Sequence, residues 1–229
     1  MDTGGPRTAV SRRAAVVAAM VALGVAGCGS PAQAPAVDPP PPGAVAAART
    51  ELRHLAVAPA RGGGYQRTAD FGPAWSLDSD RDGCRQRDDV LRRDLGAVQT
   101  RGRCTVIVGT LHDPYTGSTV QFTKAHADQV QIDHVYPLGL AWRHGAAGWP
   151  QQRRVQFAND LDNLVATSGA ANQTKSDQGP GEWMPRHQYW CAYAVRYIGV
   201  ASRYALSISA ADLTALTNAL GTCPAGGAG

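Results

Sequence analysis

The residues with the clearest potential for chemistry begin with a pair, Asp133 and His134, within the run QIDHVYPL and at the end of an expected apolar strand. Asn163 follows at the start of a second apolar run, and Asn172 and Lys175 follow that run in the stretch ANQTKSD. An imidazole with an ordinary pKa near ~6.5 is neutral at ordinary pH and can accept a proton. Hard divalent cations such as Mg²⁺ prefer carboxylate and amide oxygens. The set therefore combines a candidate general base, His134, with candidate metal ligands, Asp133 and Asn172.

Two short strands and a helix must position these residues. QVQIDHV and LDNLVATS predict the strands, and SGAANQTKSD predicts the start of a helix with Ser168 as its N-cap. Asn172 and Lys175 then share a helix face. Neighbouring residues of a regular strand point to opposite faces, so Asp133 and His134 can act together only where the strand ends and the chain turns. We expect Pro137 to make that turn.

The remaining elements follow from patterns of the same kind. DRDGCRQRDDVLRRDLGAV predicts a turn and a helix, and RGGGYQR predicts a loop. CTVIVGTLHD and GSTVQFT predict strands around the turn PYTG. RHQYWCAYAVRYIGVASRYAL predicts a long amphipathic helix. SAADLTALTNAL predicts a helix that Ser209 and Asp212 begin with a near capping box. The class is α+β.

The order strand, strand, helix with a His, an Asn and an Asn resembles the HNH nucleases, whose core is the ββα-metal finger. IDHVYPL, LDNLVA and ANQTKSD carry this resemblance, and CRQRDDVL, DPYTG, AWRHGAAGW, FANDLDNL, GEWMP and CAYAVRYI extend it over roughly residues 65–223. In this order the motifs are similar to those of the exported bacterial HNH endonuclease family proteins, which are like the GmrSD C-terminal domain. The resemblance implies a ββα-metal (HNH) core embedded in additional helices and a small antiparallel sheet.

The resemblance implies a metal-dependent endonuclease that hydrolyses phosphodiester bonds of nucleic acid, with His134 as general base. Asp133 and Asn172 are then the metal ligands, with Mg²⁺ expected and Mn²⁺ as the alternative. Asn163 holds the loop that orients the base, and Lys175 is assigned to the catalytic group. We expect DNA as substrate, with 5′-phosphate and 3′-hydroxyl ends. Low sequence specificity is expected because no element looks like a groove-reading helix.

Each of these residues also has a structural interpretation. His134 can be a buried histidine bonded to a backbone carbonyl, and Lys175 can be a surface charge. Asn163 and Asn172 can be turn and cap residues. The alternative function is therefore a non-catalytic surface lipoprotein that binds nucleic acid on an HNH scaffold. A disulfide-stapled envelope protein with a structural polar cluster is a third hypothesis.

Three arginines are candidates for contact with a nucleic-acid backbone. Arg87 lies in CRQRDDVL, and Arg153 and Arg154 lie in the helix predicted by PQQRRVQFAND. The structural alternatives are an ion pair across a helix surface for Arg87 and a solvated helix face for the other two.

The N-terminus has the features of an export signal. Arg7, Arg12 and Arg13 precede the apolar run AAVVAAMVALGVA, which is short for a membrane span and ends in VAGC at Cys28. This resembles a bacterial lipoprotein signal, with residues 1–27 as signal peptide and Cys28 as the lipidated residue. An ordinary secretory signal is the alternative. Both interpretations predict export, with the protein either lipid-anchored on the outer face of the cell membrane or secreted.

Composition and charge limit which structures and partners we expect for the rest of the chain. Residues 28–48 are rich in Pro and Ala and predict an extended tether, although residues 44–58 have a helical composition. We expect the HNH endonuclease domain at 49–224 and a flexible tail at 225–229. The chain of 229 residues with 44% hydrophobic content can bury one core. The net charge of +4 permits a polyanionic partner without arguing for one. We expect a monomer whose only membrane contact is the lipid.

The cysteines agree with export. With Cys28 set aside, four remain, and an even number in an exported chain predicts two disulfides. Several pairings are possible, and we favour Cys84–Cys104 and Cys191–Cys223 because each pair brackets one local unit. A zinc site is the alternative, but the sequence contains no CxxC.

Overall fold

The computed structural model describes residues 1–5, 38–75, 78 and 80–224. The chain divides into two units, residues 1–33 and 34–229. Of the first unit only residues 1–5 are described, and they form no helix or strand. Most of the predicted signal peptide, Cys28 and the predicted tail lie outside the described residues. None of the described helices has the length and apolar character that crossing a membrane requires.

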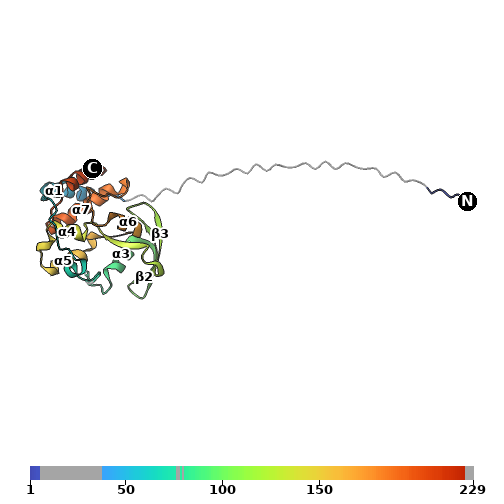
Figure 1. Cartoon of the computed structure of the whole chain (residues 1–229), viewed down its shortest axis with the longest axis horizontal. Helices are drawn as coiled ribbons and strands as arrows, with labels where there is room; N and C mark the ends of the chain where they lie inside the picture. Colours follow the sequence, from blue (N-terminus) through green and yellow to red (C-terminus); the bar gives the residue numbers. More distant parts are fainter. Residues whose placement is uncertain (6–37, 76–77, 79, 225–229) are drawn as a thin grey trace. The chain divides into compact units, whose positions relative to one another are not determined.

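The second unit contains α-helices, short 3₁₀ helices and two antiparallel sheets (Figure 1). The α-helices are α1 (Pro42–His54), α2 (Arg67–Phe71), α3 (Gln86–Asp94), α4 (Leu138–Arg143), α5 (Gln151–Ala158), α6 (Gly169–Lys175), α7 (Trp190–Tyr204) and α8 (Ala210–Gly221). The strands are β1 (Leu95–Arg101), β2 (Thr105–His112), β3 (Thr119–Thr123), β4 (Val130–His134) and β5 (Leu164–Ser168). The 3₁₀ helices are η1 (Lys124–His126), η2 (Ala146–Gly148), η3 (Leu161–Asn163) and η4 (His187–Tyr189).

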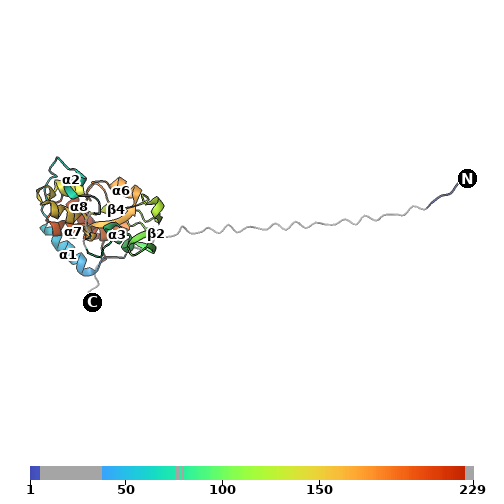
Figure 2. The ribbon, with the colours of Figure 1, turned by 90° about the horizontal axis from the view of Figure 1, so that it is seen from below.

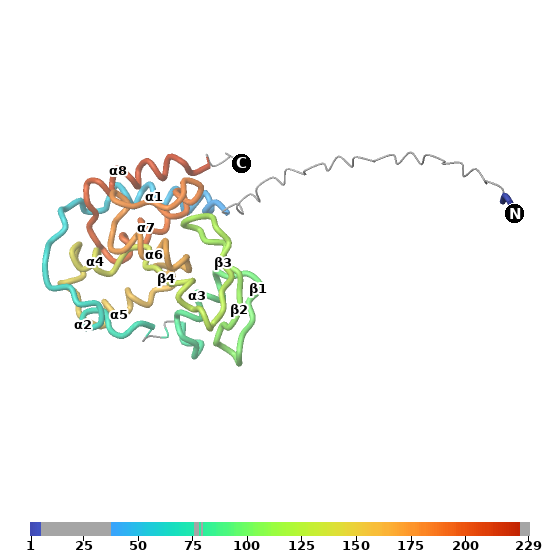
Figure 3. The backbone as a smooth tube through the Cα atoms, turned by 45° about the vertical axis from the view of Figure 1, so that its right-hand side comes forward, coloured from blue at the N-terminus to red at the C-terminus, as the bar shows by residue number. Residues whose placement is uncertain are grey.

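The two sheets have separate positions in this unit. β1, β2 and β3 pair in that order, whereas β4 pairs only with β5. Figure 3 places β4 and α6 between the three-stranded sheet and the helix α4, and Figure 2 shows β4 between β2 and α7. In the small sheet Asp133 lies opposite Val165 and His134 opposite Leu164, and α6 packs on both strands. The predicted strand–strand–helix unit is therefore present.

The packing of the core follows the same division. One hydrophobic cluster gathers residues from α1, α4, α5, α7 and α8, and the second gathers residues from α3 and the strands. Helix α7 buries Tyr193, Tyr197 and Ile198 at helical spacing, so the predicted amphipathic helix forms the centre of the first cluster. The predicted capping box of Ser209 and Asp212 is confirmed at the start of α8.

Both predicted disulfides are confirmed. Cys84 is bonded to Cys104 beside the three-stranded sheet, and Cys191 at the start of α7 is bonded to Cys223, which follows α8. The zinc alternative is therefore wrong, because no thiolate remains on these four residues to bind the metal.

The helix predicted by DRDGCRQRDDVLRRDLGAV is too long. Helix α3 ends at Asp94, and the chain continues directly as β1, with Leu95 paired to Leu111. A register shift follows Gly96, and Ala97 has a φ of 50°, which marks a bulge. Pairing with β2 therefore overrides the local helical pattern in this stretch.

The predicted tether at 28–48 overlaps α1. The helix begins at Pro42 and buries Val45, Ala48 and Leu52 at helical spacing against α7. Residues 42–48 therefore belong to the folded unit. Pro is tolerated in the first turn of a helix, so the Pro-rich composition hid this start.

Candidate active site

A strand end, a turn and a helix line a cavity of about 310 Å³. It lies where β4 ends, beside α4 and the end of α6, and a segment before α2 forms its rim. The predicted residues Asp133, His134 and Asn172 all line it. The other lining residues are Tyr65, Arg67, Ile132, Pro137, Leu138, Ser176 and Asp177.

The Asp133 carboxylate is buried and held by two donors. The Tyr115 hydroxyl donates to Oδ2 over 2.6 Å, and Lys175 Nζ lies 3.0 Å from the carboxylate. Burial raises the pKa of Asp133 and lowers that of Lys175, and the ion pair between them opposes both shifts. A carboxylate offers about four lone-pair directions, so these two bonds leave capacity for another ligand.

Lys175 is not the surface charge of the structural alternative, because its side chain is completely buried. Its ammonium group also donates to the backbone oxygen of His134 over 2.8 Å. It does not line the cavity described here. Lys175 therefore holds both members of the Asp133–His134 pair, one by its side chain and one by its backbone.

The side chain of His134 contacts different residues from those that contact the Asp133 carboxylate. Its Nε2 lies 2.9 Å from the backbone oxygen of Ala158, and its ring stacks parallel to Trp75. A carbonyl oxygen only accepts, so Nε2 carries the proton and Nδ1 is the basic nitrogen. Burial, followed by the positive charge of Arg67, lowers the pKa of His134 to about 3. The imidazole is therefore neutral near pH 7.

The expected turn after the pair is confirmed. β4 ends at His134, and Pro137 stands at the N-cap of α4. Asn163 clamps this turn, because its Oδ1 accepts from the amide of Tyr136 over 2.8 Å and its Nδ2 donates to the Tyr136 carbonyl over 3.2 Å. The backbone oxygen of Asn163 also accepts from Val135.

Helix α6 brings Asn172 to the cavity. Ser168 caps the helix through its side chain, as predicted, and the amide of Asn172 donates to Gln131 Oε1 over 2.8 Å. The bond to Gln131 uses the side-chain nitrogen of Asn172, and the side-chain oxygen is the other polar atom of the same amide group. Asp133 and Asn172 thus offer a carboxylate and an amide carbonyl at one cavity, a donor set that suits a hard divalent cation.

The three arginines predicted to contact nucleic acid have other partners. Arg87 donates to the backbone oxygens of Ala127 and Val130, and Arg153 donates to that of Tyr204. Arg154 donates to the backbone oxygen of Asp70 and lies over the Trp142 ring. In the described part of the chain none of the three lines the cavity. Their guanidinium groups stabilise loops and helix ends, which a polar helix face in the sequence does not reveal.

Arg67 is the cationic residue at the cavity that sequence reasoning missed. It begins α2, within the stretch RGGGYQR that predicted only a loop, and its side chain is exposed. Asp177 was missed as well. A Cβ on Gly139 would collide with the Asp177 carboxylate, so α4 and the segment after α6 approach closely there. No periodic pattern or motif in the sequence marks Arg67, whereas Asp177 ends the stretch ANQTKSD without having been assigned a role.

Comparison with known proteins gives the family. Residues 85–219 match the family described as GmrSD restriction endonucleases, C-terminal domain. An uncharacterized secreted protein of Arthroderma benhamiae is 42% identical over 194 residues, which cover 83% of this chain and 91% of the relative. That relative is fungal, whereas the motifs resemble those of bacterial proteins. No solved structure matches the chain. The chain belongs to the family of the GmrSD restriction endonuclease C-terminal domain.

Proposed function

We propose that this protein is an exported, metal-dependent HNH endonuclease that hydrolyses phosphodiester bonds, with DNA as its substrate and low sequence specificity. The observation that carries the proposal is the state of His134. A neutral imidazole with its Nε2 proton donated to a backbone carbonyl lines a cavity beside a carboxylate and an amide oxygen. Family membership supports the nuclease class, and nucleases of this type use a divalent metal.

In the proposed reaction, His134 Nδ1 takes a proton from a water molecule as its oxygen attacks the phosphorus. The bond from phosphorus to the 3′ oxygen breaks, and the departing oxygen takes a proton from solvent water, which leaves a 5′-phosphate and a 3′-hydroxyl. Asp133 and Asn172 would hold the metal, Mg²⁺ or Mn²⁺. When bound, the metal offsets negative charge on the phosphate and on the departing oxygen. The exposed guanidinium of Arg67 is placed to pair with a phosphate at the cavity rim.

The other roles are positional. Lys175 and Tyr115 hold the Asp133 carboxylate, and Asn163 fixes the turn behind His134. Loss of either support would leave the reacting groups present but misplaced, and misplacement by about 1 Å is enough to reduce rate strongly.

Export is supported by the two disulfides and by the secreted relative. We further propose that the protein is monomeric and that Cys28 carries a lipid that anchors it on the outer face of the membrane. Metabolic labelling with a fatty-acid analogue, compared between wild type and Cys28→Ala, tests the anchor. Equal labelling of the two proteins would contradict it.

The experiment for the activity is cleavage of supercoiled plasmid by the oxidised full chain with Mg²⁺, Mn²⁺ or chelator, with RNA in parallel. We expect metal-dependent nicking of DNA and products that a ligase can reseal, because ligation requires a 5′-phosphate and a 3′-hydroxyl. Retention of nucleic acid without cleavage under every metal condition would favour the binding-protein alternative instead.

A further inference from the structure

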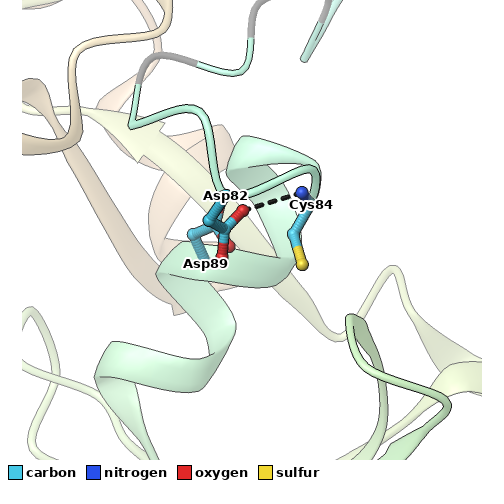
Figure 4. Close-up of side chains that lie close together, drawn as sticks. All are labelled: Asp82, Cys84 and Asp89. Atoms are coloured by element: carbon cyan, nitrogen blue, oxygen red, sulfur yellow. Dashed lines mark hydrogen bonds between the residues drawn. The ribbon is translucent and has the colours of Figure 1, made fainter.

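A second group of acidic side chains lies outside the cavity, in the segment that leads into α3. Carboxylate oxygens of Asp78, Asp80 and Asp82 lie within 4.8 Å of one another. Carboxylate oxygens of Asp82 and Asp89 also lie within that distance of each other beside Cys84. Figure 4 shows these two carboxylates side by side. The Cys84 sulfur is bonded to Cys104, so it supplies no thiolate ligand. The group therefore offers oxygen ligands.

The spacing of these residues matches a 12-residue calcium loop. Such loops place carboxylates at positions 1, 3, 5 and 12, a Gly at position 6 and a backbone carbonyl ligand at position 7. In DSDRDGCRQRDD the three aspartates come first, Gly83 follows, and Asp89 is the last residue. Gly83 has the φ of +80° that a sharp turn at this point requires. The loop departs from the usual pattern in ending on Asp instead of the longer Glu.

An independent observation comes from Asp89. The residue is only 8% exposed, and its Oδ2 is buried without a hydrogen-bond partner among the described residues. Figure 4 shows its carboxylate beside that of Asp82. Asp78 Oδ1 is also buried, and the described residues give it no hydrogen-bond partner. Burying a carboxylate oxygen without a partner destabilises the folded state, and a bound cation would offset that cost at both atoms.

Arg92 supplies part of that positive charge. Its guanidinium donates to Asp82 Oδ2 over 2.9 Å and to Asp89 Oδ1. These contacts use one oxygen of each carboxylate and leave Asp89 Oδ2 and Asp78 Oδ1 unmatched. Arg92 therefore balances the cluster only in part.

We propose that the carboxylates of Asp78, Asp80, Asp82 and Asp89 bind a calcium ion. Calcium fits better than magnesium, because it accepts many oxygen ligands in a flexible arrangement whereas magnesium demands a near-ideal octahedron. Asp89 stands in the first turn of α3, and α3 packs against β2 and β5. Bound calcium therefore ties this segment to the second hydrophobic cluster. The site is separate from the proposed nuclease cavity.

The test uses thermal melts and calorimetric titration of the oxidised full chain, freed of metal and then given Ca²⁺ or Mg²⁺ up to about 10 mM, above the affinity range of extracellular calcium modules. We expect Ca²⁺ to raise the melting temperature more than Mg²⁺. Asp82→Asn and Asp89→Asn should each weaken calcium binding at least tenfold. Asp128→Asn removes an exposed carboxylate elsewhere and should keep the full shift.

Asn172→Ala distinguishes calcium binding at the acidic group before α3 from the binding of divalent ions at the nuclease cavity. This variant should leave the calcium-dependent shift in melting temperature unchanged. If the Asp variants fail to fold, the wild-type titration decides. No calcium-dependent heat or melting shift in wild type overturns the proposal, as does a shift that survives in both folded Asp variants. Loss of the shift in Asn172→Ala alone would also overturn it, since calcium would then bind at the cavity.

Discussion

At the scale of single residues, the two interpretations of His134 prove compatible. It is a buried histidine bonded to a backbone carbonyl, and that bond is what leaves Nδ1 as the basic nitrogen. Lys175 shows what the sequence alone does not reveal. Its position was identifiable from the motif, but its burial and its contact with Asp133 depend on how α6 packs against β4. A motif specifies which residues meet, and packing determines which atoms they use.

Lys175→Met tests the ion pair directly. The substitution leaves the Asp133 carboxylate buried without its cation, and breaking such a pair costs about 3–5 kcal/mol. We expect the free energy of unfolding, measured with urea, to fall by that amount and nuclease activity to be lost. The matched control is Lys124→Met, because Lys124 is exposed. Equal stability of the two variants would show that the pair contributes nothing.

The lowered pKa of His134 predicts acid sensitivity. The unfolded state takes up a proton near its ordinary pKa of 6.5, whereas the folded state resists protonation down to about 3. The free energy of unfolding should therefore decrease as pH falls through this interval. His134→Gln should flatten this part of the curve measured by urea unfolding at successive pH values. An unchanged slope in the variant would place the titration elsewhere.

At the scale of elements, the sequence predicted most of the unit that carries the site. β4, β5, α6 and the turn at Pro137 were identifiable because alternation, capping and a proline act locally. β1 and α2 were not. Leu95–Arg101 becomes a strand because β2 is beside it, and α2 is a single short turn whose residues have no period long enough to detect. Arg67 was missed for that reason.

The β4–α4 turn depends on Asn163. Asn163→Ala removes both bonds to the Tyr136 backbone, and leaving buried groups unpaired costs about 1–3 kcal/mol. We expect a fall in kcat larger than any change in KM, because the base is displaced while substrate contacts remain. Asn218→Ala, on the exposed face of α8, is the control for kinetics and for melting. A change confined to KM would contradict a positioning role.

The position of α6 depends on Gly169. A Cβ there would lie 2.5 Å from the backbone oxygen of Asp128, so Gly169→Ala must displace the start of the helix that carries Asn172. We expect lower stability and weaker metal-dependent activity. Gly199→Ala adds the same methyl group in α7, where no described side chain or other segment lies within 4 Å of it, and should be neutral or slightly stabilising. Similar melting temperatures for the two variants would exclude a tight contact at Gly169.

At the scale of the whole described unit, the Cys191–Cys223 disulfide lies in the first hydrophobic cluster, and the Cys84–Cys104 disulfide joins the segment before α3 to the residue before β2. Their pairing was predictable because each joins cysteines that bracket one local unit. The inclusion of α1 was not, because its Pro-rich start resembles a tether and its burial depends on α7. The acidic loop before α3 was also overlooked, since turn residues and calcium ligands are the same residue types.

Removing one disulfide should therefore lower the stability of the folded unit without removing the proposed nuclease site. Cys191→Ala with Cys223→Ala frees α7 from the end of α8, and the loss should be about 2–4 kcal/mol in the free energy of unfolding. The measurement is urea unfolding beside wild type in oxidising buffer. A stability equal to wild type would show that packing of α7 and α8 alone holds this region.

The central claim is that His134 is the base of a metal-dependent nuclease, and plasmid cleavage by His134→Ala in Mg²⁺ tests it most directly. His126→Ala, which removes an exposed histidine, is the matched control. We predict that wild type and His126→Ala nick the plasmid at similar rates. His134→Ala should be slower by about 10²–10⁴-fold, the usual contribution of a general base, while remaining folded and disulfide-bonded. Cleavage by a folded His134→Ala protein at the wild-type rate would contradict the claim.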